Sequence, residues 1–260
     1  MGYENTRKVA KYYDERADNA RDNITAAGQW IPIEYTSHIC EEICKKIKLS
    51  TKHKVLEFGS GSDVLGKYVR AKCAKYVGLD ISSAMIKMSM DSINDGEKPD
   101  LIQSTTHLVP FRDNVFDITI LNSVAMYLRD EGILEKTLLE MERVTTLQGT
   151  IFVGENITSS RSYWEYTWFQ NLHPALQILA KPYVRFRLWL AKKNSVFAGK
   201  WKGYYAELSL EFLEKIFNGR ASISISDAAG YTIRKRYLKN PKGNRRVDFV
   251  INLTQGVHNA

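Results

Sequence analysis

The chain has 260 residues and a mass of 29.8 kDa, which suits one domain or one domain that carries an insertion. Hydrophobic residues make up 44% of it and charged residues 25%, a globular composition that excludes a disordered, collagen-like or disulfide-dense chain. Three cysteines are too few for a disulfide framework, and the net charge of +8 permits an acidic partner without specifying one.

The first half of the chain alternates between helical and extended patterns. Helices are expected over residues 3–22 and 33–48. Five short strands are then predicted, over residues 54–58, 76–79, 101–103, 116–121 and 150–154. The helices between these strands are expected to begin near Val64, at Ser82 or Ser83, and at Ile133. Strands that alternate with helices predict an α/β fold with a doubly wound, mostly parallel sheet.

The pattern changes after residue 157. Residues 158–205 are aromatic and basic, with helical spacing that two prolines interrupt. A further helix is predicted over residues 209–217, between an N-cap Ser209 and a stop at Asn218-Gly219. Residues 232–238 and 247–253 are expected to form two antiparallel strands around a turn at 240–244.

The positive charge is concentrated in the second half. Residues 1–157 contain 20 Lys and Arg against 23 Asp and Glu, whereas residues 158–205 contain 8 against 1. Residues 206–260 contain 9 against 5. A slightly acidic body is therefore followed by a basic segment, and the charge bears on whatever that segment contacts.

A glycine-rich turn follows the first predicted strand. Gly59 and Gly61 allow the close backbone approach that nucleotide-like ligands need, and Asp80 ends the next strand, where a carboxylate can accept hydrogen bonds from ribose hydroxyls. The third glycine of a dinucleotide fingerprint is missing, and the Asp63 carboxylate in this loop would repel a pyrophosphate. The phosphate loop of nucleotide hydrolases is absent. The expected ligand is a nucleoside without phosphate.

These segments resemble the class I S-adenosylmethionine-dependent methyltransferases. The resemblance rests on VLEFGSG at 55–61, YVGLDIS at 76–82, LVPFRDNVFDITILNSVAMYL at 108–128 and MERVTTLQGTIFVGE at 141–155. It spans residues 50–157 and, more loosely, 206–253. It implies a methyltransferase with a Rossmann-like, seven-stranded sheet, a C-terminal antiparallel hairpin and a helical cap insertion. The implied cofactor is S-adenosylmethionine, and the product is S-adenosylhomocysteine.

The expected organisation has four parts. Residues 1–48 would form N-terminal lid helices, and residues 49–157 the cofactor-binding core. Residues 158–205 would form an aromatic, basic cap on the acceptor side. Residues 206–260 would supply the C-terminal helix and the strand hairpin that complete the sheet.

The resemblance implies a set of cofactor contacts. Glu57 would meet the methionine ammonium directly or through water, Asp80 would hold the ribose hydroxyls, and Ile81 would pack on the adenine. The other implied cofactor residues are Tyr13 as a lid, Gly59, Ser60 and Gly61 under the ligand, Thr105 and Thr106 at the adenine, and Asn122 and Ser123 near the sulfonium. The residues alone leave other roles open, because Tyr13 could be a helix-core residue, Glu57 a helix cap and Asn122 a turn residue.

One departure from the family affects the adenine end. Members often place Asp-Ala where this chain has Thr105-Thr106. The Thr105 hydroxyl or backbone groups would have to take over the contact with the adenine amino group. The loss also keeps open a methyltransferase-like scaffold without catalysis.

The acceptor is constrained mainly by exclusion. Residues 122–125 are Asn-Ser-Val-Ala, which lacks the Pro-Pro-Tyr/Phe of adenine and glutamine methylases, and no cysteine follows the fourth or fifth strand to attack cytosine. Cys40, Cys44 and His38 lack a fourth metal ligand, so no metal is expected. The leading hypothesis is an O- or N-methyltransferase for a small molecule, for which the basic cap would suit a phosphate or carboxylate. His173 and Glu155 are the candidate general bases.

Two other acceptor classes stay open. The run at 183–193 could lie in a membrane interface, which would suit a quinone or a lipid-linked acceptor and peripheral contact with a membrane. The basic residues could alternatively bind RNA, although no stable nucleic-acid complex is expected. The N-terminus has no apolar signal region and no transmembrane run is present, so a cytoplasmic location is expected. The oligomeric state is left open.

Overall fold

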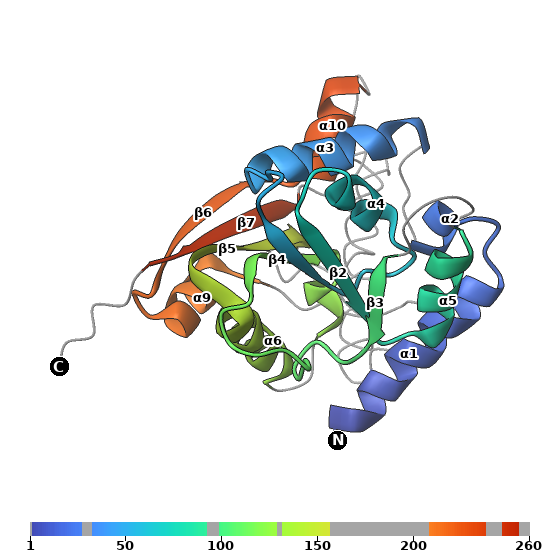
Figure 1. The fold of residues 1–260 in the computed structure, drawn as a ribbon, viewed down its shortest axis with the longest axis horizontal. Coiled ribbons are helices and arrows are strands. Elements are labelled where there is room, and N and C mark those ends of the chain that lie inside the picture. Colours follow the sequence, from blue (N-terminus) through green and yellow to red (C-terminus); the bar gives the residue numbers. More distant parts are fainter. Residues whose placement is uncertain are drawn as a thin grey trace, which may run out of the picture.

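A computed structural model describes residues 2–27, 33–92, 99–128, 132–156, 208–237 and 246–254. Within them, one sheet has the strand order β3-β2-β1-β4-β5-β7-β6 (Figure 1). The strands are β1 (Lys54–Phe58), β2 (Lys75–Asp80), β3 (Asp100–Gln103), β4 (Phe116–Asn122), β5 (Thr145–Asn156), β6 (Ala221–Asp227) and β7 (Val247–Leu253). The first five are parallel, and β7 runs antiparallel to both β5 and β6. This is the Rossmann-like, seven-stranded sheet that the resemblance implied.

The strand expected at 150–154 begins earlier than predicted. Strand β5 starts at Thr145, directly after a helix, and Thr145 pairs with Phe116. The register shifts between Phe116 and Ile118, after which the regular pairing resumes at Thr150. The β-branched Thr145 and Thr146 favour this extended start, which the sequence pattern around Gly149 had obscured.

The C-terminal strand pair was expected in the wrong place. Residues 232–238 were predicted to be a strand, but the helix α10 spans Ala229–Tyr237, and β6 is the strand that pairs with β7. Gly230 and Ile233 of α10 are buried at helical spacing, whereas β6 alternates isoleucine with serine at the period of a strand. The antiparallel C-terminal strands are therefore confirmed, with a helix rather than a tight turn between them.

The helices begin largely where the sequence predicts. They are α1 (Gly2–Asp18), α2 (Asn23–Ala27), η1 (Ile33–Tyr35), α3 (Thr36–Lys46), α4 (Val64–Arg70), α5 (Ser83–Asp91), η2 (Ala125–Tyr127), α6 (Ile133–Val144), α9 (Leu210–Phe217) and α10. The segment expected as one helix over 3–22 is α1, which ends at Asp18, followed by α2. Ser82 and Ser209 cap α5 and α9, accepting hydrogen bonds from Met85 N–H and Phe212 N–H.

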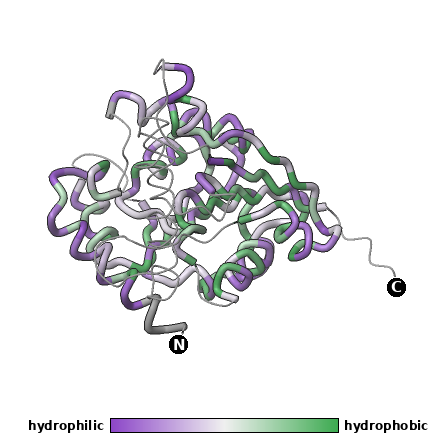
Figure 2. Tube along the Cα trace, turned by 180° about the vertical axis from the view of Figure 1, so that it is seen from behind, coloured by the Kyte–Doolittle hydropathy of each residue, from purple (hydrophilic) through white to green (hydrophobic). Residues whose placement is uncertain are grey.

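Two hydrophobic layers enclose the sheet. Helices α3, α4 and α10 pack on one face, and α6 and α9 pack on the other (Figure 1). The strands between them are predominantly hydrophobic (Figure 2). Helices α1, α2 and α5 share a smaller core around Met85. This arrangement leaves the carboxyl ends of β1, β2 and β4 free to carry a ligand site, as in other doubly wound sheets.

The cap predicted over 158–205 lies outside the described residues, as does the turn at 240–244. The cap, its role and the proposed domain boundaries stay predictions. In the part of the chain that the structure describes, no helix combines the length and the apolar character needed to cross a membrane.

Candidate functional site

The glycine loop turns sharply at the end of β1. Gly59 and Gly61 have φ values of +73° and +54°, which favour glycine. The Gly59 and Ser60 N–H groups both donate to the carbonyl of Leu79, at 2.7 and 2.9 Å. A Cβ atom on Gly59 would lie 2.5 Å from Val124 Cγ2, so the loop packs directly under the segment that follows β4. The loop is thus fixed against β2 on one side and β4 on the other.

Asp80 is the buried carboxylate at the end of β2. Its Oδ2 accepts a hydrogen bond from Gly61 N–H and its Oδ1 from Ser82 N–H, both at 2.8 Å. Burial raises the pKa of Asp80, and these backbone donors oppose that effect. Ile81 N–H is a third backbone donor to this carboxylate. The lone pair that the three donors leave can accept a hydrogen bond from a ligand hydroxyl.

Two buried oxygens near the loop have no hydrogen-bond partner among the described residues. They are Ser60 Oγ, within the loop, and Asn122 Oδ1, at the end of β4. A Cβ on Gly154 would lie 2.4 Å from Asn122 Oδ1, so this side chain needs a glycine on the neighbouring strand. Ser123 then takes a φ of +59° and donates its N–H to Gly154, which turns the chain away from the sheet. Buried acceptors without donors cost about 1–3 kcal/mol each, and a polar ligand would offset that cost.

Glu57 lies beneath the loop, on β1. Its side chain is 3% exposed, and its Oε2 accepts a hydrogen bond of 2.7 Å from the Tyr76 hydroxyl. Burial raises the pKa of Glu57 to about 8, although the Tyr76 hydrogen bond opposes the shift. Asp63, rather than Glu57, occupies the N-cap position of α4, so the structure does not favour the capping role that the sequence had left open for Glu57.

The N-terminal helix is fastened over the start of α5. Asp14 Oδ1 accepts hydrogen bonds from Ser82 Oγ, at 2.6 Å, and from Ala84 N–H, at 3.1 Å. Tyr13 consequently lies edge-on to Tyr127 of η2, with ring centroids 5.9 Å apart, and the two phenols are hydrogen-bonded. Burial raises the pKa of both phenols. Tyr13 therefore bridges from α1 to the segment after β4, as a lid residue would.

The start of α2 is fastened to the glycine loop itself. Asn23 Nδ2 donates to the carbonyl of Ser62 at 2.9 Å, and Ser62 Oγ donates back to the carbonyl of Asn23. The N-terminal segment thus contacts the loop directly as well as α5.

The residues expected at the adenine lie on the loop after β3. The Thr106 hydroxyl is hydrogen-bonded to Thr137 of α6 at 2.9 Å, whereas Thr105 forms a backbone bridge with Leu108. Gln103, which the sequence analysis did not single out, donates from its Nε2 to the carbonyl of Ile81 at 3.3 Å. Its position as the last residue of β3, at the carboxyl edge, is the signal that could have identified it.

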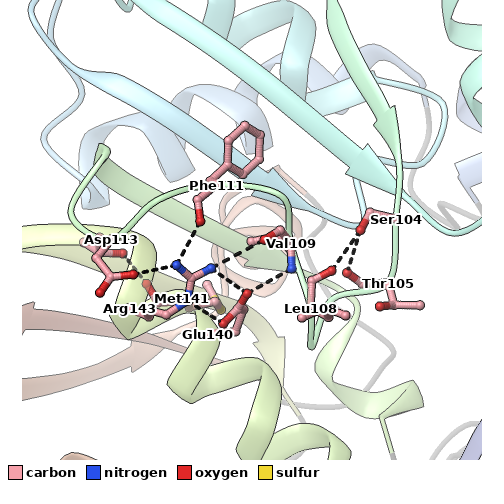
Figure 3. Close-up of polar contacts among 10 residues, drawn as sticks. Ser104, Thr105, Leu108, Val109, Phe111, Asp113, Glu140, Met141 and Arg143 are labelled. Carbon is pink, nitrogen blue, oxygen red and sulfur yellow. Dashed lines mark hydrogen bonds and ion pairs between the residues drawn. The ribbon is translucent and has the colours of Figure 1, made fainter.

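Arg143 holds the following stretch, residues 109–113, as Figure 3 shows. Its guanidinium donates to Glu140 Oε1 and Oε2, to Asp113 Oδ1, and to the carbonyls of Val109 and Phe111. The hydrogen bonds to Glu140 and Asp113 raise the pKa of Arg143. The loop between β3 and β4 is therefore fixed from α6.

The candidate base Glu155 is already engaged with the C-terminal elements. Its Oε1 accepts from Gly230 N–H at 2.9 Å, and its Oε2 lies 3.5 Å from Arg246 Nη1. Its own N–H donates to Asp248 Oδ1 at 2.8 Å. These contacts join β5 to α10 and β7, and none of its described hydrogen bonds involves the glycine loop. The other candidate base, His173, lies outside the described residues.

The cysteines belong to the core on the α3 face. Cys40 and Cys44 are buried among apolar side chains, and burial raises the pKa of Cys40 to about 12. Within the described ranges, no three His, Cys, Asp or Glu side chains gather in a way that could hold a metal ion.

Residues 56–153 match the family model described as a methyltransferase domain. This part of the chain is therefore a methyltransferase domain, and its fold is that of the class I, S-adenosylmethionine-dependent methyltransferases. No curated protein sequence matches the chain.

Solved structures share the fold at low sequence identity. Phosphoethanolamine N-methyltransferase 1 of Haemonchus contortus, solved with phosphoethanolamine and S-adenosylhomocysteine, has a TM-score of 0.69 and 12% identity. All of this chain is covered, but only 51% of that protein, so the chain spans about half its length. The [4+2]-cyclase SpnF has a TM-score of 0.62 and 12% identity, with 96% and 97% of the two chains covered. A methyltransferase of Leishmania major has a TM-score of 0.60 and 12% identity, with 93% and 82% covered.

Proposed function

We propose that the chain transfers the methyl group of S-adenosylmethionine to an oxygen or nitrogen atom of a small-molecule acceptor. The observation that supports it most is the convergence at one sheet edge of the glycine loop, the Asp80 carboxylate and the partnerless oxygens of Ser60 and Asn122. Hydroxyl and ammonium groups of a nucleoside-like ligand would supply the donors that these oxygens lack.

In such a reaction the protein positions the cofactor and the acceptor and excludes water from them. When bound, the cofactor would supply a methyl group on a positively charged sulfur. An acceptor O or N atom would attack the methyl carbon in line with the C–S bond, and S-adenosylhomocysteine would be the leaving group. Asp80 would accept from the ribose hydroxyls, and Glu57 would meet the ammonium. Tyr13 and Tyr127 would close over the ligand and keep water from the reacting atoms. His173 and Glu155 remain the candidate bases, although the contacts of Glu155 suit a structural role better.

The acceptor class is proposed from the composition of residues 158–205. Their aromatic side chains would surround a small molecule, and their 8 basic residues against 1 acidic residue would suit a phosphate or carboxylate group. The structural neighbour from Haemonchus contortus is solved with phosphoethanolamine, an anionic small molecule, which is compatible with this class. An amphiphilic acceptor at a membrane surface and an RNA acceptor are the competing classes, and a cytoplasmic location stays an expectation.

Fractionation of the transferred label separates the three acceptor classes. The full chain is incubated with cell extract and S-adenosylmethionine labelled on the methyl group, and the products are divided into lipid extract, RNA and water-soluble small molecules. We expect the label in the small-molecule fraction and its loss with an Asp80→Ala variant. Label that partitions into the lipid or RNA fraction would overturn the small-molecule acceptor, and liposome co-sedimentation would then test membrane contact directly.

A further inference from the structure

Asp63 ends the glycine loop in a backbone conformation that ordinarily favours glycine. Its φ is +64°, in the left-handed region, and its carboxylate forms a two-pronged ion pair with Arg70, with both N–O distances 2.7 Å. Asp63 is 5% exposed. A buried carboxylate in a strained position needs such a partner, and Arg70 supplies it from the last turn of α4.

Arg70 in turn contacts the residue that holds Glu57. Its guanidinium carbon lies 5.4 Å from the ring centroid of Tyr76, in a cation–π arrangement. The Tyr76 hydroxyl donates to Glu57 Oε2 at 2.7 Å, with both residues buried. The four side chains therefore form a continuous series from the loop, through α4 and β2, to the carboxylate on β1; three of them are buried and Arg70 is partly exposed.

Gly66 of α4 makes room for this series. A Cβ atom there would lie 2.0 Å from Asp63 Oδ1 and 2.4 Å from the Tyr76 hydroxyl. A side chain at position 66 would therefore displace Asp63 and Tyr76, two members of this series.

The charged and titratable groups around Glu57 come from several elements. Tyr76 and Asp80 lie on β2, Asp63 and Arg70 on the loop and α4, and the thiols of Cys40 and Cys44 on α3 also interact with it. Burial raises the pKa of Glu57, and so do the two aspartates. Tyr76 and Arg70 act in the opposite direction and favour the charged form. They are the groups that make a negative Glu57 attainable.

We propose that Tyr76, supported by Arg70 and Asp63, is a positioning residue for the cofactor: its hydroxyl holds the Glu57 carboxylate in the orientation and charge state that receive the cofactor's ammonium group. This inference rests on the proposed function, in which Glu57 meets that ammonium. It goes further in assigning a role to three residues outside the cofactor contacts.

The test compares two ligands that differ in the ammonium group. Calorimetric titration of the full chain with S-adenosylhomocysteine, which carries the ammonium, and with adenosine, which does not, is performed between pH 6 and 9. For Tyr76→Phe we expect the Kd for S-adenosylhomocysteine at pH 7 to rise about tenfold, the effect of losing one hydrogen bond to a charged group. The rise in affinity with pH should move to higher pH, because Glu57 becomes harder to ionise, while adenosine binding stays unchanged.

The matched control is Tyr68→Phe. Tyr68 lies on α4, is half-buried beside the same hydrophobic cluster and has its hydroxyl hydrogen-bonded to Ser37. Removing the Tyr68 hydroxyl should leave the affinity for both ligands and the pH profile unchanged. A Tyr76→Phe variant with the wild-type affinity and pH profile would overturn the inference, and so would equal losses for the two ligands, which indicate a general disturbance of the site.

The Glu57→Gln variant tests the role of Glu57 separately from that of Tyr76. The carboxamide can still accept from Tyr76 but carries no charge, so its affinity for S-adenosylhomocysteine should be low and flat with pH. In the Glu57→Gln background, Tyr76→Phe should change the affinity for S-adenosylhomocysteine by much less than it does in the wild-type chain, because Tyr76 acts through Glu57. Additive effects, or an unchanged pH profile in Glu57→Gln, would contradict the proposal. Failure of the wild-type chain to bind S-adenosylhomocysteine at any pH would remove the proposed function itself.

Discussion

At the scale of single residues, Asp80 and Glu57 illustrate two uses of a buried carboxylate. Asp80 accepts backbone hydrogen bonds from Gly61 in the loop and from Ile81 and Ser82, so its carboxylate is held in place before a ligand binds. Glu57 accepts one hydrogen bond from a phenol and lies among four acidic or thiol-bearing neighbours, which are Asp63, Asp80, Cys40 and Cys44. The Asp80 carboxylate is therefore arranged to accept hydrogen bonds from hydroxyls, whereas the Glu57 carboxylate would be stabilised most by a positively charged group.

Cofactor binding should release protons. Burial raises the pKa of Glu57 to about 8, so the neutral carboxyl predominates in the free chain at pH 7. A bound ammonium favours the ionised form and lowers that pKa, so protons leave Glu57 when the cofactor binds below pH 8. Titration with S-adenosylhomocysteine at pH 7 in buffers of different ionisation enthalpy should show this release. It should fade by pH 9 and be abolished in Glu57→Gln; heats that do not depend on the buffer would contradict the role of Glu57.

The sequence could reveal those site residues that occur in a recognisable order. Gly59, Gly61 and Asp80 follow the ends of two predicted strands at fixed spacing, so their convergence can be inferred from the period of the strands. Tyr76 and Tyr127 could not be found this way. In the sequence, each of these tyrosines occupies an ordinary apolar position. The partner of each side chain lies on another element, and residue spacing does not determine which way the side chain points.

At the scale of elements, the C-terminal region shows where pattern reading fails. Residues 229–237 have an aromatic and basic composition that is compatible with strand or helix, and the structure makes them a helix. Its start is fixed by Asp248, which accepts a hydrogen bond of 2.9 Å from Ala229 N–H. This contact joins residues 19 apart through a buried carboxylate, and no local propensity encodes it.

The same carboxylate joins α3 to the C-terminal strands. Lys46 Nζ lies 2.7 Å from Asp248 Oδ2 and also donates to Ser226 and to the carbonyl of Asp227. The Asp248 side chain is 1% exposed, so removing Lys46 would leave its charge without a cation. Burial raises the pKa of Asp248 to about 6, and Lys46 opposes the shift.

Lys46→Met should therefore destabilise the fold by about 3 kcal/mol at pH 7, the usual cost of breaking a buried ion pair. Chemical denaturation would measure the change. The loss should shrink towards pH 5, because below a pKa of about 6 Asp248 becomes neutral and no longer needs the cation. Lys11→Met, which removes one side of the exposed Lys11–Glu15 pair, is the control and should change the midpoint little. Equal effects of the two substitutions would show that this junction is not held by the ion pair.

At the scale of the whole molecule, the sheet order brings the functional residues together. The central strands β1, β2 and β4 end beside one another, so the glycine loop, Asp80 and Asn122 meet although together they span more than 60 residues of the chain. The N-terminal helices then attach to α5 and to the loop through Asp14 and Asn23. Sequence order predicted the first of these arrangements because parallel strands obey strong topological rules, whereas the docking of α1 depends on individual side chains.

The distribution of charge is also a property of the whole molecule. The residues up to 157, which hold the proposed cofactor site, carry more acidic than basic side chains, and the excess of positive charge belongs to later segments. Under the proposed function, the excess of acidic residues would suit a cationic cofactor, and the later excess of basic residues would suit an anionic acceptor.

Calorimetric titration with S-adenosylhomocysteine tests the central claim most directly. We expect the wild-type chain to bind, and Asp80→Ala to weaken binding about tenfold or more through the loss of hydrogen bonds to a charged group. Asp100→Ala, at the opposite end of the sheet, removes an exposed carboxylate paired with Lys75 and should bind as the wild type does. Normal binding by Asp80→Ala would show that the cofactor site is not at this edge of the sheet.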